Sequence, residues 1–194
     1  MSIFFRTLGL LLILGSCSTR YGDAPRNLDN ACSILDERPR YERAFKRVER
    51  DWGVPMPILM AIIYQESKFI SDNRPPHRYV LGVIPTGRQS SALGYSQALN
   101  GTWAEYQREE GGRGADRTDI FDAADFMGWY MNLTVEETGV ALNDTRNQYL
   151  AYHDGRAGFN RGTWRSKRWL IRIASEVEAR AVLYDTQLRR CGKI

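Results

Sequence analysis

Hydrophobic residues recur at helical spacing through most of the chain. Between Tyr41 and Trp52, apolar side chains follow one another every three or four residues with charged residues between them, which is typical of an amphipathic helix. The next stretch, Met56–Ser67, is almost entirely apolar and predicts a buried helix. Further helices are predicted over Asn100–Glu110, after a cap at Asp119 or its neighbour, from a cap at Asn143 or Asp144 to Tyr152, and over Thr163–Arg189.

Between these helices the chain shows no useful run of alternating apolar and polar residues, the pattern that would predict a strand. Residues 71–91 contain several prolines and glycines and predict a long irregular loop. Loops of that length inside a domain are usually functional or mobile. Six helices and one irregular excursion therefore predict a mainly α domain.

The first 16 residues have the pattern of an export signal. One positive charge, Arg6, precedes the apolar run Thr7–Leu14, which is too short to span a bilayer as a helix. The following Leu14-Gly15-Ser16-Cys17 resembles the lipobox of bacterial lipoproteins, which implies cleavage before Cys17 and lipidation of that cysteine. An ordinary secretory signal with an incidental cysteine is the alternative.

This pattern divides the chain into three parts. We expect residues 1–16 to be a lipoprotein signal peptide, residues 17–38 a lipid-anchored tether and residues 39–194 the folded domain. Lipidation of Cys17 implies attachment to a membrane on the periplasmic side of the cell envelope, with the outer membrane as the expected place.

Two cysteines, Cys32 and Cys191, remain once Cys17 is lipidated. Exported proteins meet an oxidising compartment, so we expect these two to form a disulfide that ties together the ends of the folded part. In the chain-entropy model, closing so long a loop contributes roughly 4–5 kcal/mol. Two free thiols are the alternative.

Composition excludes several classes of protein. A content of 43% hydrophobic and 26% charged residues argues against a disordered or coiled-coil chain. The net charge of +4 is too small for a dedicated nucleic-acid binder, and an export signal also disfavours nucleic acid as a partner. Two histidines and three cysteines, with no CxxC spacing, argue against a metal site of His and Cys.

Glu66 is the candidate for chemistry. It continues the apolar face of its predicted helix, four residues after Ile62 and three after Ile63. Burial and the negative end of the helix dipole would both raise its pKa. A carboxyl that stays protonated near neutral pH is suited to general acid catalysis. The alternative is a Glu66 that turns to solvent or pairs with an arginine.

Three short motifs follow one another along the chain. Glu66-Ser67 ends the apolar helix, Gly94-Tyr95-Ser96-Gln97 follows the long loop, and Ala151-Tyr152-His153 lies in a later helix. In this order they resemble the lytic transglycosylases with a soluble-transglycosylase (SLT) catalytic domain, which are related to goose-type lysozymes. The resemblance covers roughly residues 41–169. It implies a lysozyme-like helical fold with a long irregular loop after the catalytic helix.

The resemblance implies a role for each matching residue. Glu66 would be the single acid and base, and Ser67 would bond near the carboxyl or the N-acetyl group of the sugar. Gln97 would line the cleft, and Gly94 would let the backbone approach the substrate closely. Tyr152 would place its hydroxyl near Glu66. Core packing of Tyr152, and a loop amide without a role at Gln97, are the alternatives.

Two residues of the motifs depart from the family pattern. Tyr95 begins the pair Tyr95-Ser96 where the family usually has Leu-Met, and His153 stands where it usually has Asn. We expect both to contact the substrate. Because His titrates near neutral pH, a His153 beside Glu66 would favour the ionised form of Glu66 when protonated.

The family resemblance implies cleavage of the β-1,4 bond between N-acetylmuramic acid and N-acetylglucosamine, leaving 1,6-anhydro ends. It implies no cofactor and no metal. Asp72 or Asp154, if either faced Glu66, would permit hydrolysis by a muramidase instead. A peptidoglycan-binding lipoprotein without activity is the third possibility.

The expected partners are peptidoglycan glycan strands and, through Cys17, a membrane. The sequence leaves open whether the enzyme serves wall recycling, cell division or the opening of the wall for a secretion machine.

Overall fold

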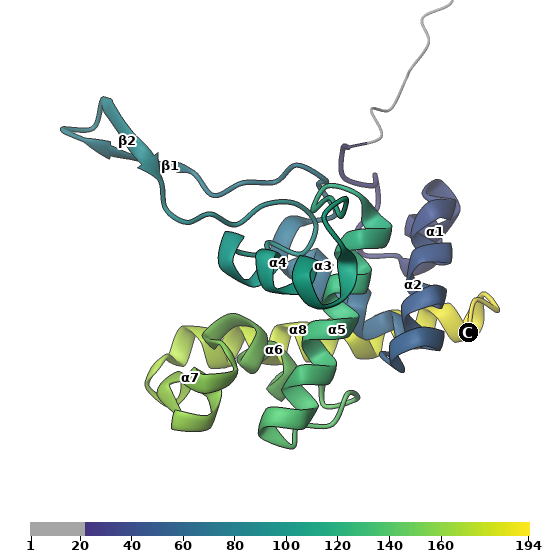
Figure 1. The fold of residues 1–194 in the computed structure, drawn as a ribbon. Helices are drawn as coiled ribbons and strands as arrows, with labels where there is room; N and C mark the ends of the chain where they lie inside the picture. The colour runs from purple at the N-terminus through teal and green to yellow at the C-terminus, as the bar shows by residue number, and fades with distance from the viewer. Residues whose placement is uncertain (1–21) are drawn as a thin grey trace, which may run out of the picture.

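The computed structural model describes residues 22–194, and in this part of the chain eight α-helices share one core while a two-stranded sheet projects from them (Figure 1). The prediction of a mainly α fold is therefore confirmed. The helices are α1 (Ala31–Glu37), α2 (Pro39–Trp52), α3 (Met56–Ser67), α4 (Asn100–Tyr106), α5 (Ile120–Thr138), α6 (Thr145–Asp154), α7 (Arg156–Arg161) and α8 (Arg168–Arg190). A π-helical turn, η1 (Gln107–Gly111), continues α4, and a 3-10 turn, η2 (Thr163–Ser166), precedes α8.

Helix α3 is the most deeply buried helix because nearly all of its residues are apolar. Every residue from Met56 to Ile63 is buried, and α3 packs along the C-terminal helix α8. Helix α2 packs against α5 in the same core. Because α3 is fixed along its length by this packing, the residues at its C-terminal end are held in place.

The predicted helix starts at Asp119 and Asp144 are borne out by side-chain caps. The Asp119 carboxylate accepts a hydrogen bond from the N–H of Phe121, at 2.8 Å, and starts α5. The Asp144 carboxylate accepts one from the N–H of Asn147, at 3.1 Å, and starts α6. Two short helices, α1 and α7, were not predicted, because six or seven residues are too few to show a clear helical period.

The expectation of an irregular loop over residues 71–91 is corrected by the structure. This segment contains an antiparallel hairpin of β1 (His77–Val80) and β2 (Ile84–Arg88), carried away from the helices on two extended arms (Figure 1). Every residue of both strands is exposed. Apolar and polar residues alternate along a strand when one of its faces is buried. Neither face of this hairpin packs on a core, so its sequence lacks the alternation that would have predicted the strands.

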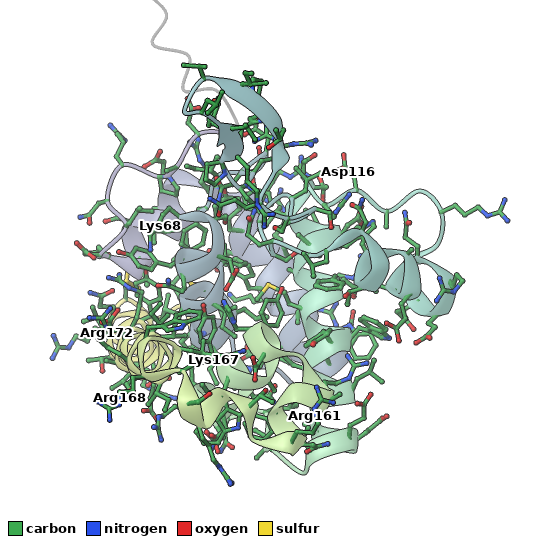
Figure 2. All side chains as sticks on the ribbon, turned by 90° about the vertical axis from the view of Figure 1, so that its left-hand side faces the viewer. Lys68, Asp116, Arg161, Lys167, Arg168 and Arg172 are labelled. Atoms are coloured by element: carbon green, nitrogen blue, oxygen red, sulfur yellow. A yellow bond between two sulfur atoms is a disulfide. The ribbon has the colours of Figure 1, made fainter. Side chains whose placement is uncertain are left out.

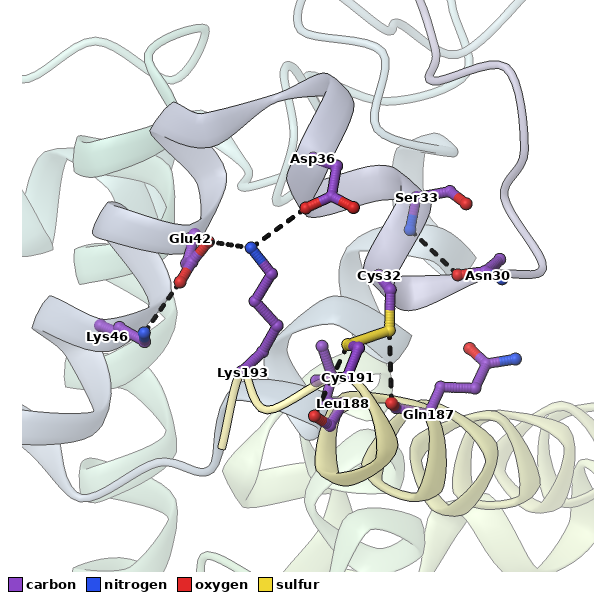
Figure 3. A network of polar contacts seen from close by, with 10 residues as sticks. All are labelled: Asn30, Cys32, Ser33, Asp36, Glu42, Lys46, Gln187, Leu188, Cys191 and Lys193. Atoms are coloured by element: carbon purple, nitrogen blue, oxygen red, sulfur yellow. Dashed lines mark hydrogen bonds and ion pairs between the residues drawn. A yellow bond between two sulfur atoms is a disulfide. The ribbon is translucent and has the colours of Figure 1, made fainter.

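The two ends of the described chain are joined covalently. Cys32 in α1 and Cys191 directly after α8 form a disulfide with their Cα atoms 6.5 Å apart, which confirms the predicted pair (Figure 3). Beside it, Lys193 pairs with the carboxylates of Asp36 and Glu42, at 3.1 and 2.8 Å. Both contacts fasten the C-terminal end of the chain to α1 and α2.

The N-terminal boundary of the domain lies earlier than residue 39. Helix α1 falls within the segment expected to be a tether, yet Ala31, Ile34 and Leu35 are fully buried in the core. Cys17 and the signal segment lie outside the described residues. Within residues 22–194, no helix is long and apolar enough to cross a membrane.

Candidate active site

Glu66 is the penultimate residue of α3, and the chain turns sharply after the helix. Lys68 and Phe69 both have left-handed backbones, with φ of 53° and 62°, a conformation that residues other than glycine rarely adopt. Phe69 is fully buried, and its ring stacks on that of Tyr41 with centroids 5.7 Å apart. Packing of this ring holds the strained turn, which ends α3 directly after Ser67.

Burial controls the protonation of the Glu66 carboxyl. Because little water reaches it, the pKa of Glu66 is raised from its ordinary 4.5 to about 7. The Tyr149 hydroxyl donates a hydrogen bond to the carboxylate, and the positive charge of Lys68 also acts on it. Both lower this pKa, but by less than burial raises it. The Glu66 carboxyl therefore keeps its proton to a higher pH than an exposed glutamate and is able to act as an acid.

Two tyrosines of α6, one helical turn apart, lie close to Glu66. Tyr149 is buried and is the hydrogen-bond donor, a contact that the three sequence motifs do not indicate. Burial and then the charge of Glu66 raise the pKa of Tyr152, whose hydroxyl donates to the Ser96 carbonyl at 2.6 Å. The spacing of three residues between the two tyrosines places them on one helix face and is the signal that could have identified Tyr149.

The segment from Gly94 to Gln97 is fixed by its backbone. Gly94 has φ of 82°, and a Cβ there would lie only 2.0 Å from the carbonyl oxygen of Arg117, so a glycine is required. The Gln97 side-chain amide donates to the carbonyls of Asn73 and Gly94, at 2.9 and 2.8 Å. Asn73 in turn donates to the Glu66 carbonyl at 3.3 Å. Gln97 thereby braces this segment against the turn that follows α3.

A surface hollow of about 250 Å³ opens between the start of α4, helix α5 and the end of α6. Its wall combines aromatic and aliphatic side chains with amide, hydroxyl and carboxylate groups, a mixture suited to a sugar. Tyr152 lines the hollow, and burial and then the charge of Glu66 raise its pKa. This tyrosine therefore lies close to both the acid and the hollow. The lining residues are Gln97, Ala98, Leu99, Thr102, Phe126, Tyr130, Tyr152, His153, Asp154 and Gly155.

The structure places Ser67 and Tyr95 in the core, although Ser67 was expected to bond near the Glu66 carboxyl or the sugar N-acetyl group and Tyr95 to contact the substrate. Ser67 is 1% exposed, and its hydroxyl donates to the carbonyl of Ile63 at 3.2 Å within α3. Tyr95 is 2% exposed, and its hydroxyl lies 3.2 Å from that of Tyr41. Both side chains therefore contact the core and stabilise the backbone of the site, and neither is open to a substrate.

His153 lines the hollow, and its ring contacts Tyr149, with centroids 6.3 Å apart. Its ring packs edge-on against Trp169 with centroids 5.1 Å apart. Burial lowers the pKa of His153, Lys167 lowers it further, and Asp154 raises it; Glu66 is not among the groups that act on it. The expected coupling between His153 and Glu66 is therefore not supported.

Neither candidate for a second catalytic carboxylate is among the groups that shift the pKa of Glu66. Burial alone would raise the pKa of Asp154, but hydrogen bonds from Lys167 and Thr163 outweigh it and hold this pKa below its ordinary value. Asp72 is exposed to solvent. In residues 22–194, the groups that shift the pKa of Glu66 are a tyrosine and a lysine, and no carboxylate is among them.

Comparison with known proteins agrees with this geometry. A family model described as "Transglycosylase SLT domain" matches residues 5–191, nearly the whole chain. No curated protein matches. The family consists of transglycosylases that act on peptidoglycan in the periplasmic space, and the mainly α fold described above is consistent with its lysozyme-like domain.

Proposed function

The chain belongs to the transglycosylase SLT domain family, and from this premise we propose that it is a lytic transglycosylase of peptidoglycan. It cleaves the β-1,4 bond between N-acetylmuramic acid and N-acetylglucosamine and leaves 1,6-anhydro ends. The observation that carries the proposal is the state of Glu66: a carboxyl with a pKa raised to about 7, a tyrosine donor and no carboxylate among the groups that act on it.

The reaction needs one group that first gives a proton and then takes one. The Glu66 carboxylic acid protonates the bridging oxygen, the bond from that oxygen to C1 of the muramic acid breaks, and the N-acetylglucosamine end leaves as an alcohol. The substrate's own N-acetyl oxygen stabilises the cationic C1. The Glu66 carboxylate then takes the proton of the C6 hydroxyl, whose oxygen bonds to C1 and closes the anhydro ring. No water is consumed, and a pKa near 7 suits both proton transfers.

The residues around the hollow are proposed to bind the glycan. Tyr152, His153 and Gln97 line the hollow and supply aromatic surface and polar groups, and Gly94 lets this segment pack closely against the Arg117 backbone. Tyr149 is proposed to orient the Glu66 carboxyl and to stabilise the carboxylate that forms after the first proton transfer.

Export and anchoring belong to the same proposal. Residues 1–16 act as a lipoprotein signal peptide, and Cys17 becomes the lipidated N-terminus that holds the enzyme on the periplasmic side of the outer membrane. The Cys32–Cys191 disulfide supports export, because such bonds persist in oxidising compartments. Replacement of Cys17 by Ala should prevent acylation, which metabolic labelling with a fatty acid would detect; continued acylation would contradict the assignment.

Digestion of purified sacculi, followed by mass spectrometry of the products, tests the activity. The wild-type chain should release muropeptides with anhydro ends, and Glu66→Gln should release none while keeping the fold. Glu178→Gln, which changes an exposed carboxylate of α8 in the same way, is the matched control and should behave as the wild type. Reducing ends in place of anhydro ends would show hydrolysis, and unchanged turnover by Glu66→Gln would reject Glu66 as the acid.

A further inference from the structure

The tip of the β1–β2 hairpin carries a concentration of exposed apolar side chains. Of the ten large hydrophobic residues that are exposed in residues 22–194, five lie within six consecutive positions at this tip. They are Tyr79, Val80, Leu81, Val83 and Ile84, between 50% and 86% exposed. Clusters of this kind on a soluble surface usually mark an interaction site.

The fold does not need these residues at the tip. Leu81 is 86% exposed and has a left-handed backbone with φ of 53°, a conformation that favours Asn, Asp or Gly in a turn. The hairpin buries none of its strand residues against the helices. An apolar tip therefore stabilises nothing inside residues 22–194, and its chemistry suits contact with something outside the chain.

Positive charge surrounds the base of the apolar tip. Arg78 on β1 donates to the carbonyl of Gln89, at 3.2 Å, and Arg88 on β2 donates to that of Pro75, at 2.7 Å. These bonds fix both guanidinium groups across the two arms of the hairpin, and Arg74 adds a third positive charge. The sequence has no acidic residue from 73 to 104. An apolar tip above a cationic base is the pattern of a segment that enters the interface of an anionic bilayer.

The position of the hairpin brings it to the same side as the proposed lipid anchor. The hairpin arm leaves the domain at Ser71, whose N–H donates to the carbonyl of Gly22, at 3.1 Å. Cys17 precedes Gly22 by five residues, so a lipidated Cys17 would hold this point within about 18 Å of the membrane. The ten residues from Ser71 to Leu81 span at most about 35 Å when extended, enough to reach that surface.

We propose that residues 79–84 insert into the interface of an anionic phospholipid bilayer while the arginines at the base of the hairpin bind its headgroups. The hairpin would be a second attachment to the membrane beside the lipidated Cys17, and this arrangement rests on the proposed anchoring at Cys17. The affinity of the hairpin for lipid does not depend on that anchoring. Two attachments restrict rotation of the domain about the tether. In Figure 2 the hairpin lies at one end of the face that carries Arg161, Lys167 and Arg168 at the other, so these cations would be directed away from the membrane.

Vesicle sedimentation of the unacylated chain tests the hairpin by itself. The protein is residues 17–194 with Cys17→Ser, which retains every buried core residue, since these lie between Ala31 and Leu188. Vesicles of equal parts phosphatidylglycerol and phosphatidylcholine should bind it, and vesicles of phosphatidylcholine alone should bind it more weakly. The variant Leu81→Asn/Val83→Thr keeps residue types suited to this turn and strand and should weaken binding roughly tenfold or more.

The same two changes on α8 provide a matched control. Val182 and Leu183 are 64% and 42% exposed, and Val182→Thr/Leu183→Asn should leave vesicle binding unchanged. Equal binding by the two double variants, or no binding by the parent protein, would overturn the proposal. Loss of a dimer in the hairpin variant, without vesicle binding by the parent, would also overturn it and assign the tip to contact with a second copy. The same proteins are also assayed by sacculus digestion. Release of anhydro products without vesicle binding would reject the membrane proposal alone, and vesicle binding without products would reject the proposed activity alone.

Discussion

Replacement of Glu66 by Gln should stabilise the protein at alkaline pH while it removes the acid. The folded protein raises the pKa of this carboxyl from 4.5 to about 7, so it keeps a proton that the unfolded chain releases over that range. The free energy of unfolding of the wild type therefore falls as pH rises from about 4.5 to about 7. Below this window the carboxyl is protonated in both states and imposes no such cost.

The size of the effect follows from the shift itself. At 1.36 kcal/mol per pKa unit, a rise from 4.5 to about 7 corresponds to about 3 kcal/mol of lost stability once the carboxyl is ionised in both states. The glutamine side chain of the Glu66→Gln variant has a similar shape, accepts the Tyr149 hydrogen bond and has no charge to bury. The variant should thus unfold with a free energy about 3 kcal/mol higher at about pH 8, and about the same at pH 4.

Denaturant titration at both pH values, with the disulfide intact, measures this difference directly. For a domain of this size, about 3 kcal/mol also corresponds to a rise of roughly 6–12 °C in Tm at the alkaline pH. Glu178→Gln is the control, because this exposed carboxylate should give no pH-dependent difference. A Glu66→Gln protein whose advantage over the wild type is equal at the two pH values would refute the idea that burial sets the state of Glu66.

Other parts of the site give shorter tests. Tyr149→Phe removes the donor that lowers the pKa of Glu66, so the alkaline limb of the profile of anhydro-product release should move to higher pH; an unmoved limb would exclude this contact. Gly94→Ala places a methyl group 2.0 Å from the Arg117 carbonyl oxygen and should cost about 3 kcal/mol or more in unfolding free energy. Wild-type stability in a denaturant titration would contradict that geometry. Cys32→Ser opens the disulfide and should lower the unfolding free energy by about 2–5 kcal/mol, which the same titration measures against the oxidised wild type.

Local pattern was sufficient for the elements that carry the acid. Helix α3 has the bounds that its apolar run predicted, and Asp119 and Asp144 start their helices through caps that are visible in the sequence. The hairpin was missed because strand prediction depends on one buried face, and neither face of β1 or β2 is buried. The spacing of hydrophobic residues predicts a helix or strand only where one face of that element packs against a core.

The surroundings of Glu66 were less predictable than its position. A motif shows that Ser67, Tyr95 and Tyr152 lie near the acid, but it does not show which way each side chain points. Ser67 and Tyr95 proved to be buried, while Tyr149, one turn before Tyr152, supplies the hydrogen bond to the carboxylate. The direction of each side chain depends on how α3 and α6 are placed relative to each other. Their placement arises from contacts between residues far apart in the sequence, which a short motif does not contain.

The bond between Cys32 and Cys191 makes almost the entire domain a closed covalent ring. The exposed hairpin is the part of that ring most open to a protease, and a cut there would place Glu66 on one fragment and Tyr149 on the other. Without the disulfide, the two halves of the site would then be separate polypeptides. With it, a nicked molecule remains one covalent body whose helices can stay packed. In a compartment that contains proteases, the ring would let the enzyme survive damage to its most exposed segment.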